Sequence, residues 1–219
     1  DGKLSRGLGD VYKRQEYALA AKSYLKGIKK YPEHKASSCA RLDYAYCLYK
    51  LYKYEEAITE LEYLVEKEVQ IREVYSLLAR IYTILGKTFS AKIVLEQAVA
   101  RFEDDLHFSA LLLHTSVIQN ESIEDILSLK DVVEQSKEKL SLNDDKMLIV
   151  DTALAHFELR YGEIEIADRM IARLLATGRA PYEVHLMRAE RFMQRNRIFH
   201  AREQLRKASR LQPRDPRAN

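Results

Sequence analysis

The chain has 219 residues, of which 47% are hydrophobic and 32% are charged, with a formal net charge of +3. Seven glycines and four prolines are few for this length, so the composition excludes collagen-like and low-complexity sequences and is typical of a mostly helical protein. No apolar run approaches the ~18 residues that a membrane-spanning helix needs.

The first fifteen residues are set apart by one string. Residues 5–15 read SRGLGDVYKRQ, which resembles one reading frame of the transposase adapter used to prepare DNA sequencing libraries, and the chain has no initiating methionine. We therefore expect residues 1–15 to be non-native and the native sequence to begin at Glu16, with a signal peptide, an anchor or an enzymatic domain possible upstream. The alternative is a genuine first helix, because Leu8, Val11 and Tyr12 have helical spacing.

The first native helix is predicted over residues 16–31, which read EYALAAKSYLKGIKKY. Pro32 follows it, where a residue without an amide hydrogen ends a helix at little cost. We interpret this helix as the second of a hairpin whose native first helix is lost. Its apolar face is therefore expected to lack part of its cover.

Four later segments repeat one pattern of helix, short turn and second helix, over residues 44–65, 78–99, 154–175 and 188–209. Ala57 and Ala91 lie 34 residues apart in this pattern, and so do Ala167 and Ala201. Apolar residues recur at helical spacing around them, and a small residue at one point of each hairpin lets two helices approach closely. A period of this length predicts stacked helical hairpins.

The turns and the fourth unit complete the expected array. Gly86 and Gly162 come just after a first helix, where we expect a left-handed backbone. The fourth unit, at about residues 106–140, lacks both the glycine and the alanine, so we expect it to pack irregularly. The predicted domains are one solenoid over residues 16–213, with this degenerate unit inside it, and a short tail at 214–219.

These features resemble the tetratricopeptide repeat. The matching residues are Leu78, Ala79, Tyr82, Gly86, Ala91, Leu95 and Ala98, then Leu154, Ala155, Gly162, Ala167 and Ile171, then Ala189, Phe192, Ala201, Leu205, Ala208 and Pro213. The resemblance covers roughly residues 16–213. It implies an all-α fold, a right-handed α-solenoid of about five to six antiparallel helix hairpins, and a non-enzymatic scaffold that binds a protein or peptide on its concave face.

In this family the inner face of each first helix lines the groove that binds the partner. Mapped by helical spacing, the groove residues implied here are Leu42, Tyr46, Tyr49, Lys50, Glu73, Ser76, Arg80, Thr83, Thr152, His156, Leu159, Arg160, Glu183, Leu186, Glu190, Met193 and Gln194. Tyr46 and Tyr49 are the most attractive of them, because tyrosine offers a rigid apolar body with a polar tip. The alternative is that both tyrosines pack between helices, as we expect for Tyr44.

The sequence contains no pattern that predicts catalysis. It has no phosphate-binding loop, dinucleotide fingerprint, zinc-protease helix or serine-hydrolase elbow, so no cofactor, metal or catalytic residue is assigned. Cys39 and Cys47 lie eight residues apart on one predicted helix, about 12 Å, which is too far for a disulfide. We expect two buried free thiols, which favours a reducing compartment such as the cytoplasm. Leu42, Tyr46 and Leu77 also occupy the places of the clamp by which chaperone-binding members hold a carboxylate, so that mode of binding is not expected.

The charge is unevenly distributed. From Asp168 to Arg217 the chain has thirteen basic and five acidic residues, and twelve of its nineteen arginines lie at or beyond Arg169. A solvated outer surface of the last hairpin explains this best. The alternatives are nucleic-acid or acidic-partner binding through the arginine-rich last hairpin. The arginines that would bind such a partner are Arg188, Arg191, Arg195, Arg197, Arg202 and Arg206. A further alternative is that the chain is a regulatory portion of a larger enzyme.

Overall fold

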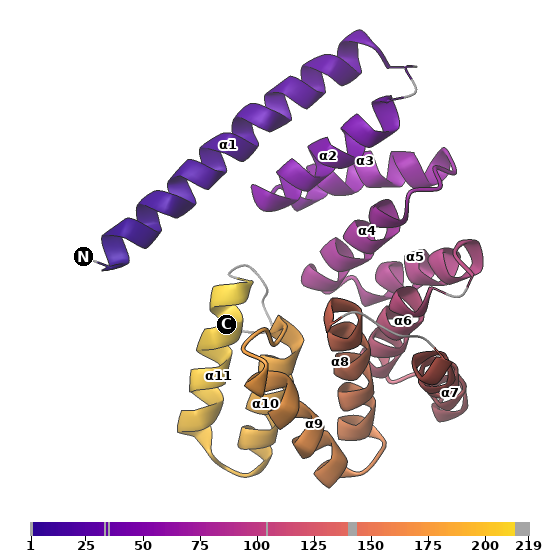
Figure 1. The fold of residues 1–219 in the computed structure, drawn as a ribbon, viewed down its shortest axis with the longest axis vertical. Helices are drawn as coiled ribbons and strands as arrows, with labels where there is room; N and C mark the ends of the chain where they lie inside the picture. Colours follow the sequence, from indigo (N-terminus) through magenta and orange to yellow (C-terminus); the bar gives the residue numbers. More distant parts are fainter. Residues whose placement is uncertain (1, 33, 35, 104, 140–143, 213–219) are drawn as a thin grey trace. The chain divides into compact units, whose positions relative to one another are not determined.

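The computed structural model describes residues 2–32, 34, 36–103, 105–139 and 144–212, with side chains for all of these except 2–12, 139 and 144–146 (Figure 1). Within these residues the chain forms eleven helices and no strand, so the predicted all-α class is confirmed. The helices are α1 (Gly2–Lys30), α2 (Ser37–Lys50), α3 (Tyr54–Glu66), α4 (Arg72–Ile84), α5 (Thr88–Arg101), α6 (Leu106–Gln119), α7 (Ile123–Lys139), α8 (Asp144–Arg160), α9 (Ile164–Ala176), α10 (Tyr182–Gln194) and α11 (Ile198–Leu211). Pro213 and the predicted tail lie outside the described residues.

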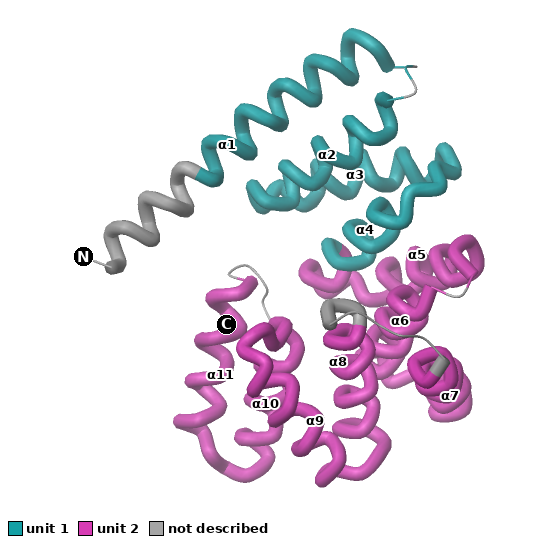
Figure 2. The backbone as a smooth tube through the Cα atoms, viewed as in Figure 1, with its two compact units in different colours: residues 1–81 teal, residues 82–219 magenta. Residues whose placement is uncertain are grey.

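The helices form two compact units, residues 1–81 and 82–219 (Figure 2). In unit 1, α1 packs on α2 and α2 packs on α3. In unit 2, α6 packs on α5, α7 and α8, then α8 packs on α9, and α10 packs on α11. Neighbouring helices are joined by short turns, which is the local arrangement expected of helical hairpins.

Helix α1 is longer than predicted. It begins at Gly2 rather than Glu16 and ends at Lys30, just before Pro32. Ala21 and Ile28 are buried, whereas Leu19 is 66% exposed, so α1 buries one stripe and leaves apolar surface uncovered, as the sequence predicts. A helical backbone is compatible with either origin of residues 1–15, so their non-native origin stays a prediction.

The periodic alanines lie at the same point of each second helix. Ala57, Ala91, Ala167 and Ala201 are at most 2% exposed. Each donates its amide to the carbonyl four residues earlier, which makes it the fourth residue of its helix. A methyl group at this buried position leaves room for the neighbouring helix, which is the physical reason for a small residue at this point of the four hairpins.

Four of the five turns inside the hairpins share one geometry. Tyr52, Gly86, Asn120 and Asn196 all have a positive φ, between 53° and 71°. In each turn the residue directly after the left-handed one donates its amide to the carbonyl oxygen five residues before it, as in Lys53 to Leu48 and Lys87 to Tyr82. This is the bond that closes a helix with a left-handed residue.

Gly162 departs from that geometry, so the predicted left-handed backbone there is wrong. Its φ is not positive, and the amide of Glu163 donates to the Glu158 side chain, Oε2, at 3.0 Å. A Cβ at Gly162 would lie 1.9 Å from that same oxygen. The glycine therefore makes room for the Glu158 carboxylate rather than supplying a left-handed turn.

The fourth hairpin, α6–α7, is irregular in a specific way. Asn120 takes the place of the turn glycine with φ 53°, 34 residues after Gly86. One extra residue then precedes the second helix, so the fully buried Ile126 occupies the position that alanine has elsewhere. Helices α7 and α8 are also longer than their counterparts, at 17 residues each. The irregularity is therefore one inserted turn residue, a larger core residue and two longer helices.

Candidate functional site

The tyrosines predicted to line the groove form a cluster in unit 1. Tyr46 and Tyr49 lie on α2 with ring centroids 6.2 Å apart, and Tyr17 of α1 meets Tyr46 edge-on at 6.3 Å. The Lys50 ammonium lies 5.1 Å from the centre of the Tyr46 ring and 5.5 Å from that of Tyr49. Tyr46 is 42% exposed, whereas Tyr44 is buried, as the sequence predicts for Tyr44. The cluster thus presents aromatic surface and a cation together.

Tyr17 is a member of this cluster that the sequence did not point to. It precedes Tyr46 by 29 residues and lies on a different helix. Only the packing of α1 on α2 brings the two rings together. On the other side Tyr49 contacts Tyr54 of α3 at 6.0 Å between ring centroids, so the cluster is anchored in the core of unit 1.

The other predicted residues of α2 and α4 are placed as follows. Leu42 is half-buried on α2. On α4, Glu73 and Arg80 are exposed, while Ser76 and Thr83 are half-buried. The four predicted side chains of α4 are therefore exposed or partly exposed. Among the predicted residues of α2 and α4, Tyr46 is the largest exposed apolar side chain.

In unit 2 the predicted residues of α8 and α10 meet at one ion pair. The Arg160 guanidinium lies 3.1 Å from the Glu190 carboxylate, which joins the first helices of consecutive hairpins. Met193 and Gln194 follow at the end of α10, where both are exposed and Gln194 accepts a hydrogen bond from Arg191. Three further predicted residues, Leu159, Glu183 and Leu186, are buried or half-buried.

Several solved structures are similar to this chain, including the following three. A tetratricopeptide repeat protein from Parabacteroides merdae matches with a TM-score of 0.52 and 13% identity, covering 96% of this chain and 93% of its own. TTC0263, a thermophilic TPR protein in Thermus thermophilus, matches with a TM-score of 0.57 and 22% identity, covering 83% and 94%. YrrB, a TPR protein with an unusual peptide-binding site, matches with a TM-score of 0.50 and 16% identity, covering 90% and 96%.

The chain has the tetratricopeptide-repeat fold. All three structures are TPR proteins and each match extends over most of both chains, so the predicted helical-repeat solenoid is confirmed. No protein-family model matches the sequence, and no curated protein matches it. In the TPR register α2, α4, α6, α8 and α10 are first helices, and α3, α5, α7, α9 and α11 are second helices.

Two residues predicted for the TPR groove are buried within unit 2. Thr152 is 6% exposed and its hydroxyl donates to the carbonyl of Leu148. His156 is 7% exposed, and its Nδ1 lies 3.1 Å from Nδ1 of His114 on α6. His156 therefore packs against the preceding first helix, α6.

The arginines of the last TPR hairpin divide into two groups. Arg191 is buried, and its Nε and Nη2 atoms each lie 3.1 Å from a carboxylate oxygen of Asp168 on α9. Arg195 donates to the same carboxylate at 2.5 Å, and Arg188 lies 3.6 Å from it. The hydrogen bond from Arg191 holds the pKa of Asp168 below its usual value, and the charges of all three arginines act in the same direction. Half of the arginines predicted to bind nucleic acid are therefore committed to a contact inside the array.

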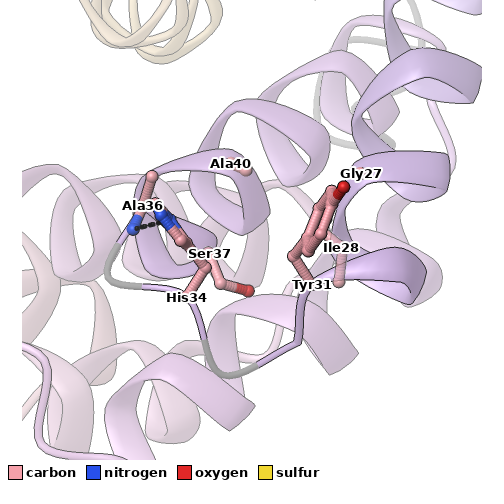
Figure 3. A pocket seen from close by; sticks show the side chains of 7 residues that line it. All are labelled: Gly27, Ile28, Tyr31, His34, Ala36, Ser37 and Ala40. Atoms are coloured by element: carbon pink, nitrogen blue, oxygen red, sulfur yellow. Dashed lines mark hydrogen bonds between the residues drawn. The ribbon is translucent and has the colours of Figure 1, made fainter.

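A pocket of about 440 Å³ lies at the turn between α1 and α2 (Figure 3). Ile28 and Tyr31 line one side of it, and Ser37 on the other side is buried, with a hydroxyl that makes no hydrogen bond to the described residues. The His34 Nδ1 accepts a hydrogen bond from the amide of Ala36. The lining of the pocket is almost entirely apolar. No nucleophile and base among its described residues are hydrogen-bonded to each other. The pocket was not indicated by the sequence, because it lies in a turn.

The described residues carry no constellation for metal or membrane chemistry. They contain no group of three or more His, Cys, Asp or Glu side chains placed to hold a metal ion. None of the described helices is both long and apolar enough to cross a membrane. Cys47 is buried, and burial raises the pKa of its thiol, but Cys39 is exposed. The prediction of two buried thiols is thus wrong for Cys39, which lies in the first turn of α2.

Proposed function

We propose that the chain is a non-enzymatic interaction scaffold that binds a segment of a partner protein on the faces of its first helices. The observation that carries this proposal is the cluster of Tyr17, Tyr46, Tyr49 and Lys50. Tyrosine and cationic groups that share one surface are typical of protein-binding hot spots, because each ring has a large apolar area and few rotatable bonds. YrrB, which is similar to this chain in structure, has a peptide-binding site, and this supports a peptide as the class of ligand here.

The chemistry of the cluster defines the peptide it would accept. The exposed part of Tyr46 offers an apolar face, and Lys50 offers a cation over two rings. A partner segment with an apolar or aromatic side chain would pack on the ring, and a carboxylate beside it would meet Lys50.

The proposal is tested by capturing partners with the full chain and then measuring the affinity of an identified partner for variants. Tyr46→Ala combined with Tyr49→Ala should weaken binding by about 2 kcal/mol or more, as expected for two central aromatic residues. Tyr46→Ala alone should have most of this effect, since Tyr46 is the more exposed ring. Tyr63→Ala is the matched control, because Tyr63 is 36% exposed on α3 outside the cluster. Unchanged affinity in both Tyr46 variants would reject this surface.

Nucleic-acid binding by the last hairpin is a weaker candidate. Only Arg197, Arg202 and Arg206 of the six predicted arginines remain outside the Asp168 cluster. Binding that depends on phosphate contacts would weaken steeply with salt, so a filter-binding series in increasing salt tests this alternative. A role as the regulatory portion of a larger enzyme also stays a prediction, which the full-length gene would decide.

A further inference from the structure

The outer face of α11 carries a row of arginines that is separate from the Asp168 cluster. Arg202, Arg206 and Arg210 lie four residues apart, so they share one face of the helix. All three are exposed, and none makes an ion pair or hydrogen bond with the described residues. On α10, by contrast, Arg188, Arg191 and Arg195 all contact Asp168. We call Arg202, Arg206 and Arg210 the arginine row.

Large apolar side chains lie at the N-terminal end of the arginine row. Ile198 and Phe199 begin α11 and are 60% and 78% exposed, and helical spacing places both beside Arg202. The buried side of α11 consists of Ala201 and Ala208, so the large side chains of this helix contribute little to the core of unit 2.

This arrangement is unfavourable for a free helix. Like charges four residues apart repel each other by a few tenths of a kcal/mol, and Ile198 and Phe199 expose apolar surface to water. An acidic partner would offset both costs, since its carboxylates would pair with the guanidinium groups and an apolar side chain would cover Ile198 and Phe199. We propose that the outer face of α11 binds an acidic protein segment that has a large apolar residue at the end next to Ile198 and Phe199.

The pattern favours a peptide over a nucleic acid or a membrane. Of Ile198 and Phe199, only Phe199 has a ring on which a base could stack. The exposed apolar side chains beside the row are confined to the first turn of α11, so this face has no continuous apolar surface that could enter a bilayer. This surface lies on a second helix, so the inference does not depend on the tyrosine cluster.

The charge requirement is tested with the full chain and a fluorescein-labelled peptide of about 15 residues, the length of the row as a helix. The peptide has a leucine near one end, followed by three glutamates at four-residue intervals. The triple variant Arg202→Gln, Arg206→Gln, Arg210→Gln should bind it about tenfold more weakly, as expected for the loss of three surface ion pairs. Circular dichroism should be unchanged, because all three side chains are exposed.

A matched control separates this site from general charge. Lys22, Lys26 and Lys30 are exposed on α1 at the same four-residue spacing, and changing all three to glutamine removes the same charge. This variant should bind the peptide within about twofold of the unchanged chain. Equal weakening by the two triple variants, or no weakening by the arginine variant, would overturn the proposal.

The apolar requirement has its own matched pair. Phe199→Ser should weaken peptide binding severalfold, while Phe89→Ser should leave it unchanged. Phe89 is the second residue of α5, as Phe199 is of α11, and it is 70% exposed. Uridine oligonucleotides and vesicles that contain phosphatidylserine serve as the other probes. Tighter binding of either of these than of the acidic peptide would also overturn the proposal.

Discussion

Asp168 is the residue that most affects the electrostatics of the last two hairpins. Its carboxylate receives two hydrogen bonds from Arg191, which is buried, and it also neutralises part of the charge of Arg188 and Arg195. Because the folded-state pKa is lowered, ionised Asp168 stabilises the fold at neutral pH. This contribution is complete above the unfolded-state pKa of about 3.9 and is lost as the pH falls through the folded-state value.

We therefore expect Asp168→Asn to lower the free energy of unfolding by about 2 kcal/mol at neutral pH, because a buried guanidinium loses its charged acceptor. The difference between the two proteins should shrink below about pH 4, where the unchanged chain begins to lose the same charge. Urea unfolding at several pH values measures this. Glu203→Gln removes an exposed i,i+4 pair with Lys207 and should cost at most about 0.5 kcal/mol. A pH-independent difference would contradict the assigned role.

Other single residues show where the sequence stops being informative. The helical position of His156 was predictable, but its burial was not, because the cover comes from His114, 42 residues earlier. Cys39 and Cys47 share a helix, yet only Cys47 faces the core. In both cases the tertiary neighbour rather than the local pattern decides whether a side chain is accessible.

At the scale of the element, the hairpin turns explain the repeat better than the glycines do. A left-handed residue followed by one specific backbone bond closes first helices at Tyr52, Gly86, Asn120 and Asn196. The sequence signals only Gly86, because the other residues adopt this conformation without being glycine. The turn at Gly162 uses the Glu158 side chain instead. Turn geometry is therefore more regular here than turn composition.

The turn at Asn120 provides a direct test. Asn120→Ala should destabilise the chain by about 1 kcal/mol, because a Cβ without a hydrogen-bonding side chain is strained at positive φ. Asn120→Gly should be neutral or slightly stabilising. Gly86→Ala is the parallel change at the matching turn and should resemble Asn120→Ala, since no side chain or backbone atom blocks a Cβ at Gly86. Thermal unfolding followed by circular dichroism distinguishes these outcomes, and equal stability of the alanine and glycine variants at position 120 would refute the argument.

At the scale of the whole molecule, the first fifteen residues have the clearest consequence. Among the side chains of α1 that the structure describes, Ala21 and Ile28 are buried, and both follow Glu16, as does Tyr17 of the tyrosine cluster. Residues 13–15 are exposed, and the Arg14 guanidinium contacts the Tyr52 ring near the predicted junction.

Because we expect residues 1–15 to be non-native, deleting them should change the free energy of unfolding by less than about 1 kcal/mol. The same deletion should leave binding at the tyrosine cluster intact, since Tyr17 is retained. Chemical denaturation of the two chains measures the first effect. A large loss of stability would show that these residues pack on the array, whatever their origin.

The sequence by itself determined the repeat. A 34-residue period of alanines and helical apolar spacing specifies helical hairpins, because these signals are local and recur on both sides of the irregular α6–α7 hairpin. It also located the tyrosines of α2 and the uneven distribution of arginines. Only the tertiary structure decided which of these side chains are accessible. The Tyr17 contact, the burial of Thr152 and His156, and the division of the arginines between Asp168 and the arginine row all depend on pairs of residues from different helices. Such pairs are fixed by how helices pack on one another, and the spacing of apolar residues within one helix does not specify that packing.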